Sequence, residues 1–216
     1  MTIVVTAFKA VPDFAKGHVK DLRVRWALEE AGLSYDSRLI DGADQAAEGY
    51  RRWQPFGQVP AYRDGEVELF ESGAIVLHIA QRSDALMPRE VAARARVTTW
   101  VIAALNSIEP YVSNVINLDL FHDGEAWVEE RRPSAMAILR TRLDALAAWL
   151  GEKDYLEDRF TAGDLIMTTV LRDLIERDVM SEFPSLDAYR KRCEARPAFG
   201  RALDAQLRDF GDDEAA

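Results

Sequence analysis

The chain has 216 residues, of which 48% are hydrophobic, and a formal net charge of −10 at pH 7. This length allows one large domain or two smaller ones, and the acidic balance argues against nucleic acid as a partner, because phosphate binding needs a basic surface. A lone cysteine, Cys193, excludes an intrachain disulfide and a paired-cysteine redox or zinc site. The sequence lacks a signal-peptide pattern and a run of the ~18 apolar residues that a membrane span needs. We therefore expect a cytoplasmic protein without membrane partner or bound metal.

The first 83 residues alternate patterns of strand and helix. The run IVVTAF is short and β-branched, as in a buried strand, whereas VKDLRVRWALEEA has helical spacing and stops at Gly32. A strand, a polar helical region, two short strands and an apolar helix follow. The expected ranges are 3–8, 19–31, 34–39, 41–53, 61–63, 67–70 and 72–82. This β-α-β-α-β-β-α order predicts a compact mixed-sheet domain.

The two short strands enclose Asp64-Gly65, which predicts a type I′ hairpin turn. Val59-Pro60 stands before the first of them, although proline cannot donate a hydrogen bond to a sheet and holds the preceding residue extended. Proline at this entry leaves the N–H and C=O of Val59 unpaired by the sheet, so an extended ligand could pair with them like an added strand. An ordinary trans proline at a strand start is the alternative.

Glu71 and Ser72 follow the hairpin, where the apolar helix begins. Ser72 is expected as the N-cap, and its hydroxyl forms an anion site together with the first free N–H groups of the helix. The Glu71 carboxylate supplies the opposite charge, so the pair suits the ammonium and carboxylate of one amino acid. The alternative is that Ser72 only caps the helix and Glu71 is a solvated charge.

Beyond Leu86-Met87-Pro88 the strand patterns stop and only helical patterns remain. The expected helices cover about 89–118, 125–150, 162–179, 185–195 and 197–209. Strands followed only by helices predict two domains. We place them at residues 1–83 and 89–216, with a linker at 84–88.

Three motifs carry a resemblance to a known family. The segment WQPFGQVPAYRDGEVELFESGAIVLHIA resembles the glutathione transferase signature, with its Pro-x-Gly-x-Val-Pro loop, hairpin and Glu-Ser pair opening a helix. RVRWALEEAGLSY resembles the first helix of that family, and FTAGDL resembles the Ser/Thr-x-x-Asp cap of its buried helix. The resemblance covers nearly the whole chain. It implies an α+β thioredoxin-like N-terminal domain followed by an all-α helical-bundle domain.

The same resemblance implies glutathione as a co-substrate and assigns residues to it. The main chain of Val59, with Pro60 cis, would hold the cysteinyl part of glutathione, and Gln58 could help to hold the tripeptide. Glu71 and Ser72 would hold the γ-glutamyl ammonium and carboxylate.

One part of the family pattern is missing. Family members have a Tyr, Ser or Cys after the first strand that stabilises the glutathione thiolate, and residues 9–20 contain none of the three. Alignment on RVRWAL places the expected group near His18, Val19 or Lys20. The charges of His18 and Lys20, or the main-chain N–H groups of Val19 and Lys20, could replace it, because a cation or a helix N-terminus favours a thiolate. Lys9 is a further candidate, and solvated loop charges are the alternative.

The helical half supplies two other assignments. The resemblance gives Thr161 and Asp164 a structural role, in which they cap a helix whose N–H groups water cannot reach. Tyr111 follows Pro110, which should kink its helix. The Tyr111 ring could line a hydrophobic substrate pocket, with core packing as the alternative.

Two functional hypotheses follow. The first is a glutathione-dependent enzyme that presents the thiolate to a small hydrophobic electrophile bound by the helical domain, or that reduces a peroxide or a disulfide. The second is a non-catalytic binding or interaction protein, which the missing Tyr, Ser or Cys favours. The family commonly forms two-fold dimers, so the resemblance also implies a homodimer.

Overall fold

The computed structural model describes residues 2–175 and 177–210, which form two compact units. Among the described residues, the first unit contains those up to Arg89 together with those from Ala195 to Phe210, and the second spans Glu90–Glu194. The division falls next to the expected linker at 84–88. In one respect it differs from the expected domain over 89–216: the last helix packs in the first unit, because its buried face lies against a helix of that unit.

A four-stranded sheet forms the centre of the first unit. Its strands are β1 (Ile3–Phe8), β2 (Tyr35–Ile40), β3 (Ala61–Asp64) and β4 (Val67–Phe70), in the order β2-β1-β3-β4. β1 pairs with β2 in parallel and with β3 antiparallel, and β3 pairs with β4 antiparallel. The predicted mixed sheet is confirmed. Because β1 pairs with β2 on one side and with β3 on the other, the loops that lead into these two strands are held in place relative to β1.

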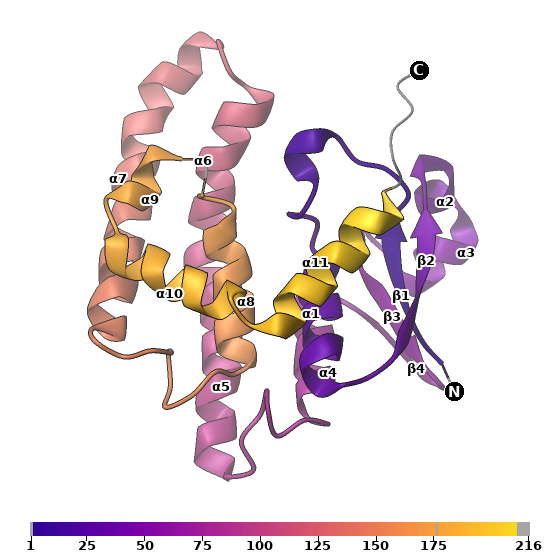
Figure 1. Cartoon of the computed structure of the whole chain (residues 1–216). Coiled ribbons are helices and arrows are strands. Elements are labelled where there is room, and N and C mark those ends of the chain that lie inside the picture. Colours follow the sequence, from indigo (N-terminus) through magenta and orange to yellow (C-terminus); the bar gives the residue numbers. More distant parts are fainter. Residues whose placement is uncertain (1, 176, 211–216) are drawn as a thin grey trace. The chain divides into compact units, whose positions relative to one another are not determined.

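Among the described residues, the first unit has five α-helices and a 3-10 helical turn (Asp13–Ala15). The α-helices are α1 (Asp21–Ala31), α2 (Gly42–Ala46), α3 (Glu48–Trp53), α4 (Ser72–Ala80) and α11 (Pro197–Asp209). Figure 1 shows the sheet between α1 and α4 on one side and α2 and α3 on the other. α1 ends at Gly32, whose φ of 66° is left-handed, and the Leu33 N–H donates to the Leu28 carbonyl. Glycine adopts this conformation without a steric penalty, which is why the predicted helix stops there.

The hairpin turn differs from the prediction by one residue. Asp64 pairs with Val67, so the loop is Gly65-Glu66 and not Asp64-Gly65. Of these two residues only Gly65 has a positive φ, 62°. Glycine at the first central position is the pattern of a type II′ turn, whereas a type I′ turn needs a positive φ at both positions.

The second unit is helical in all its described regular elements. These are α5 (Val91–Ala103), a π-helical turn (Ala104–Ile108), α6 (Glu109–Phe121), α7 (Ala126–Leu150), α8 (Ala162–Arg172), α9 (Asp178–Ser181) and α10 (Pro184–Glu194). The single helix expected over 89–118 is interrupted by the π-helical turn just before Pro110, whose missing N–H cannot continue an α-helical ladder. No helix among the described residues is long and apolar enough to cross a lipid bilayer.

Candidate functional site

The loop that leads into β3 is held on both sides of Val59-Pro60. The Tyr50 hydroxyl donates to the Gln58 carbonyl at 2.6 Å and lies 2.9 Å from Thr6 Oγ1, which accepts the Ala61 N–H at 2.7 Å. Burial raises the pKa of the Tyr50 phenol, so its proton is retained for this contact. Sequence analysis did not single out Tyr50 or Thr6, which lie 44 residues apart in the chain. They fix the main chain around Val59.

The Val59–Pro60 peptide bond is cis, as the resemblance implied. The Val59 side chain is buried in a cluster with Ile40, Tyr50 and Trp53. Its main-chain N–H and C=O make no hydrogen bond with any described residue. The side chain is therefore anchored while both polar groups of the main chain are left for another partner. Gln58 is exposed beside them.

Glu71 and Ser72 lie at the start of α4, but the N-cap is Glu71 and not Ser72 as predicted. The N-cap of α4 is Glu71, with a left-handed φ of 69° and no capping side chain, and Ser72 is the first helical residue. A non-glycine residue with this φ is uncommon and costs of order 1–3 kcal/mol, so it is found mainly where function requires it. The exposed Glu71 carboxylate makes no ion pair or hydrogen bond with the described residues.

The start of α4 presents donors without acceptors. The N–H groups of Ser72, Gly73 and Ala74 find no acceptor among the described residues, and the first α-helical bond runs from Ile75 to the Glu71 carbonyl. A buried guanidinium, that of Arg23 on α1, donates to Ser72 Oγ at 3.3 Å. Free N–H groups beside a buried cation make this helix start a favourable place for a carboxylate. Sequence analysis missed Arg23, since only the packing of α1 against α4 brings it here.

The candidate activating segment, His18–Lys20, immediately precedes α1. This helix was expected to begin at residue 19 and begins two residues later, at Asp21. The Val19 side chain packs against the cluster that contains Val59, so the two segments lie together although 40 residues separate them. The Val19 N–H makes no hydrogen bond with the described residues. His18 is half-buried and Lys20 is exposed. Three of the predicted segments thus converge: the start of α1, the entry to β3 and the start of α4.

Lys9, a further candidate, lies elsewhere. Its ammonium forms ion pairs with Asp41 at 2.7 Å and Asp44 at 3.5 Å, at the start of α2. These carboxylates raise the pKa of Lys9, chiefly through the hydrogen bond to Asp41. The Lys9 ammonium is therefore paired with the two carboxylates that form the capping box of α2.

A buried polar network lies directly behind the start of α1. Asp21, the first residue of α1, binds Arg25 at 2.7 Å and accepts a hydrogen bond of 2.7 Å from Gln206 on α11. Arg25 also binds Asp209 of α11 at 2.6 Å. Burial is the largest influence on Asp21 and raises the pKa of its carboxyl to about 6, against the opposing effect of Arg25. The two contacts with α11 are not visible in the sequence, because α11 follows α1 by more than 160 residues, whereas Asp21 and Arg25 are an i,i+4 pair within α1.

Asp21→Asn tests this network through the pH dependence of stability. In the folded protein Asp21 has a pKa of about 6, above the 3.8 of an unperturbed aspartate. Its proton is therefore held by the folded chain and released by the unfolded chain between those values, so this stabilisation is present below pH ~4 and lost as the pH rises through ~6. The difference in unfolding free energy, wild type minus D21N, should fall by about 3 kcal/mol between these limits. Urea denaturation across the range measures it, and parallel pH profiles would contradict the assignment.

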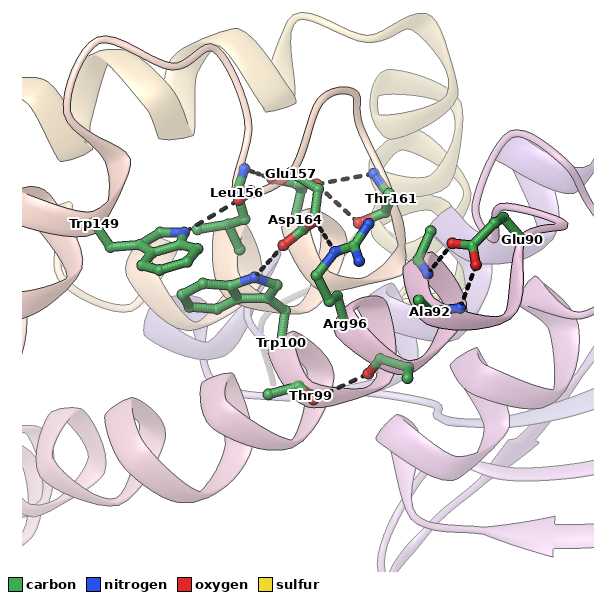
Figure 2. A network of polar contacts seen from close by, with 12 residues as sticks. Glu90, Ala92, Arg96, Thr99, Trp100, Trp149, Leu156, Glu157, Thr161 and Asp164 are labelled. Atoms are coloured by element: carbon green, nitrogen blue, oxygen red, sulfur yellow. Dashed lines mark hydrogen bonds and ion pairs between the residues drawn. The ribbon is translucent and has the colours of Figure 1, made fainter.

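Thr161 and Asp164 form the cap that the resemblance implied, at the start of α8 (Figure 2). The Asp164 carboxylate accepts from the Thr161 N–H, the Thr161 hydroxyl, the Leu156 N–H and the Tyr189 hydroxyl, at 2.8–3.0 Å. Burial raises the pKa of this carboxyl, while the four donors favour its charged form. The cap also fastens the preceding loop, because Leu156 lies between α7 and α8.

Tyr111 lies on α6 in the second unit and is half-buried. Its hydroxyl accepts from Arg142 Nη2 at 3.0 Å, and the Arg142 guanidinium stacks over the ring at 4.7 Å. These contacts give Tyr111 a packing role between α6 and α7. Among the described residues no group of three or more His, Cys, Asp or Glu side chains is arranged to hold a metal.

The family model described as "Glutathione S-transferase, N-terminal domain" matches residues 15–81. A glutathione S-transferase of Silene vulgaris is 30% identical over 203 residues, covering 85% of this chain and 92% of that protein. A disulfide-bond oxidoreductase of Escherichia coli is 28% identical over 191 residues, covering 81% of this chain and 65% of that protein.

Solved structures give the same result for the fold. A glutathione transferase family member from Pseudomonas fluorescens, solved with two glutathione bound, matches with a TM-score of 0.80 and 25% sequence identity. The match covers 94% of this chain and 92% of that one. The thioredoxin-like N-terminal domain and the helical domain predicted from the sequence are confirmed.

Proposed function

Because the chain belongs to the glutathione transferase family, we propose that it binds glutathione, stabilises its thiolate and presents it to a small hydrophobic electrophile. One observation carries the proposal: three sets of polar groups that have no partner among the described residues converge in the first unit. They are the main chain of Val59, the carboxylate of Glu71 and the first N–H groups of α4. Their chemistry matches the main chain, the ammonium and the carboxylate of one γ-glutamyl peptide.

Each group has a complementary part in glutathione. The N–H and C=O of Val59 pair with the cysteinyl main chain as an added strand would, while the exposed Gln58 lies at the edge of the tripeptide. Glu71 pairs with the γ-glutamyl ammonium. The Ser72 hydroxyl and the N–H groups behind it bind the γ-glutamyl carboxylate, with Arg23 adding positive charge from α1.

The thiolate is stabilised from the start of α1. A free thiol has a pKa of ~8.5, so activation means favouring its anion. The main chain at Val19 and Lys20 and the positive end of the α1 dipole do this without a hydroxyl, with the side chains of His18 and Lys20 in the same segment. The chain's own cysteine is no alternative nucleophile, because burial raises the pKa of Cys193 to about 12.

A second reaction, thiol-dependent reduction of a disulfide or peroxide, uses the same site. The disulfide-bond oxidoreductase among the relatives supports it. A non-catalytic binding protein is the third possibility, supported by the absence of Tyr, Ser and Cys from residues 9–20. The polar groups of Val59 and Glu71 that no described residue binds weigh against it, since a pure interaction module has no use for them. We also propose that the protein acts as a homodimer in the cytoplasm.

Immobilised glutathione tests the binding, and two assays separate the reactions. We expect the protein to be retained, to be eluted by free glutathione, and to conjugate a general aromatic electrophile. Turnover of a hydroperoxide or a mixed disulfide without conjugation would identify a reductase. Retention without any turnover would identify a binding protein, and failure to bind glutathione would refute the proposal.

A further inference from the structure

Two side chains hold the peptide planes on either side of Gln58, the residue that precedes Val59. Gln45 Nε2, on α2, donates to the Gly57 carbonyl at 2.7 Å, and the Tyr50 hydroxyl, on α3, donates to the Gln58 carbonyl at 2.6 Å. The C=O of one residue and the N–H of the next lie in one rigid plane. The two donors therefore fix the orientations of the Gln58 N–H and the Val59 N–H, neither of which bonds to a described residue.

Arg51, on α3, joins α2 to the start of the same loop. Its Nε donates to the Gln45 carbonyl at 3.0 Å, and its Nη1 donates to the Pro55 carbonyl at 3.1 Å. A guanidinium presents its N–H groups in fixed directions, so one side chain can bridge two carbonyl groups. Gln45 accepts from Arg51 through its main chain and donates to Gly57 through its side chain. Arg51 and Gln45 thus form one clamp on residues 55–57.

The Arg51 guanidinium also lies against Gly57, which is buried. A Cβ at Gly57 would lie 2.7 Å from Arg51 Cζ, a separation too short for two atoms that are not bonded. A side chain at this position would therefore displace the guanidinium from its carbonyl partners. The glycine of the Pro-x-Gly-x-Val-Pro loop is needed here for the close approach of Arg51.

The side chain of Arg51 is exposed and forms no ion pair with a described residue. Water can take over the hydrogen bonds of an exposed side chain, so their loss costs folding little. Arg52, the next residue of α3, is also exposed, but its guanidinium pairs with Glu48 of the same helix. None of the contacts of Arg52 with described residues reaches the loop. The two neighbouring arginines therefore differ in their contact with the loop and not in their charge.

We propose that Arg51, acting with Gln45, is a positioning residue for glutathione: it holds the loop before β3 in the conformation in which the main chain of Val59 pairs with the cysteinyl part of the tripeptide. This inference rests on the proposed function, and it requires no contact between Arg51 and the ligand. When a loop is loose, only a fraction of the molecules can bind, and the apparent dissociation constant rises by the inverse of that fraction.

Arg51→Met tests the role, because methionine keeps an unbranched, flexible side chain but donates no hydrogen bond. We expect the dissociation constant for glutathione, measured by titration calorimetry, to rise about tenfold, as for a loop that is competent in about one molecule in ten. The kcat at saturating glutathione should stay within about twofold, since the segment His18–Lys20 is untouched. The midpoint of urea unfolding should be nearly unchanged, whereas a purely structural role would lower it and leave the affinity of the folded protein as it was.

Two variants separate the bridge from the charge. Arg52→Met removes the same charge from the next residue and should change the dissociation constant less than about twofold, because exposed charges are screened. Arg51→Lys keeps the charge but loses the planar fork, so we expect nearly the loss seen in R51M. If R51K binds glutathione like wild type, or if R51M and R52M lose affinity equally, charge and not position is responsible and the proposal is overturned.

The outcomes also distinguish this inference from the proposed function. If wild type does not bind glutathione, the proposed function fails, and this inference fails with it. If wild type binds and R51M binds equally tightly, only the positioning role is overturned. Gln45→Ala covers an R51M variant that does not fold, because it removes only the donor to the Gly57 carbonyl. We expect a rise of the dissociation constant of about three- to fivefold in Q45A, and an unchanged value would refute the clamp.

Discussion

Glu71→Gln is expected to raise the dissociation constant for glutathione about 10- to 100-fold, with the free energy of unfolding nearly unchanged. The Glu71 carboxylate is exposed and has no partner among the described residues, so its neutralisation breaks no contact of the folded protein. In the complex it would lose a charge-assisted hydrogen bond to the γ-glutamyl ammonium, worth about 1.5–3 kcal/mol. The backbone strain at the left-handed φ of 69° is the same for glutamine as for glutamate, so the substitution does not change it. Titration calorimetry measures the affinity.

Glu68→Gln is the matched control, three residues earlier on the same hairpin. Glu68 is exposed and pairs with Arg63 across the strands at 2.6 Å. This variant changes the net charge by the same amount, so it reports the general electrostatic effect on binding, which should be below about threefold because exposed charges are screened. Equal losses of affinity in E71Q and E68Q would show that Glu71 does not hold the ammonium.

Asp164→Ala is expected to destabilise the protein by about 3–5 kcal/mol, because it removes the acceptor for four buried donors at once. Two of these donors belong to Thr161, one to the Leu156 N–H and one to Tyr189. All four lie where water cannot replace the carboxylate, so each donor pays its desolvation cost after the substitution. Urea unfolding followed by circular dichroism measures the loss.

Asp158→Ala controls for the loss of an aspartate from the same part of the chain. Asp158 lies in the loop between α7 and α8 and is exposed, so we expect a change within about 0.5 kcal/mol. Asp164→Asn should fall between these two variants, because its oxygen can accept part of the network while its amide group faces donors. A loss below about 1 kcal/mol in D164A would contradict the account of the cap.

The local parts of the candidate site could be predicted because they are set by neighbouring residues. Val59-Pro60 is recognisable because proline is unsuited to a strand entry, and Glu71-Ser72 because a polar pair begins an apolar helix. The helix expected over about 197–209 is α11, Pro197–Asp209. The predicted ends of helices were less accurate, because a single hydrogen bond can move a helix end by one residue. The N-cap of α4 proved to be Glu71 and not Ser72.

The order of strands and helices, the division into a mixed-sheet part and a helical part, and the segments that carry polar groups could all be predicted from the sequence, because periodicity, proline and capping act over a few residues. Which groups surround those segments depends on tertiary packing. Tyr50 and Thr6 clamp the Val59 loop, Arg23 lies behind Ser72, and Gln206 meets Val19. Each of these contacts joins side chains from different elements, and their identities follow no local pattern. The contacts of a buried glutamine such as Gln206 can be identified only once the fold shows that its amide donates to the Val19 carbonyl.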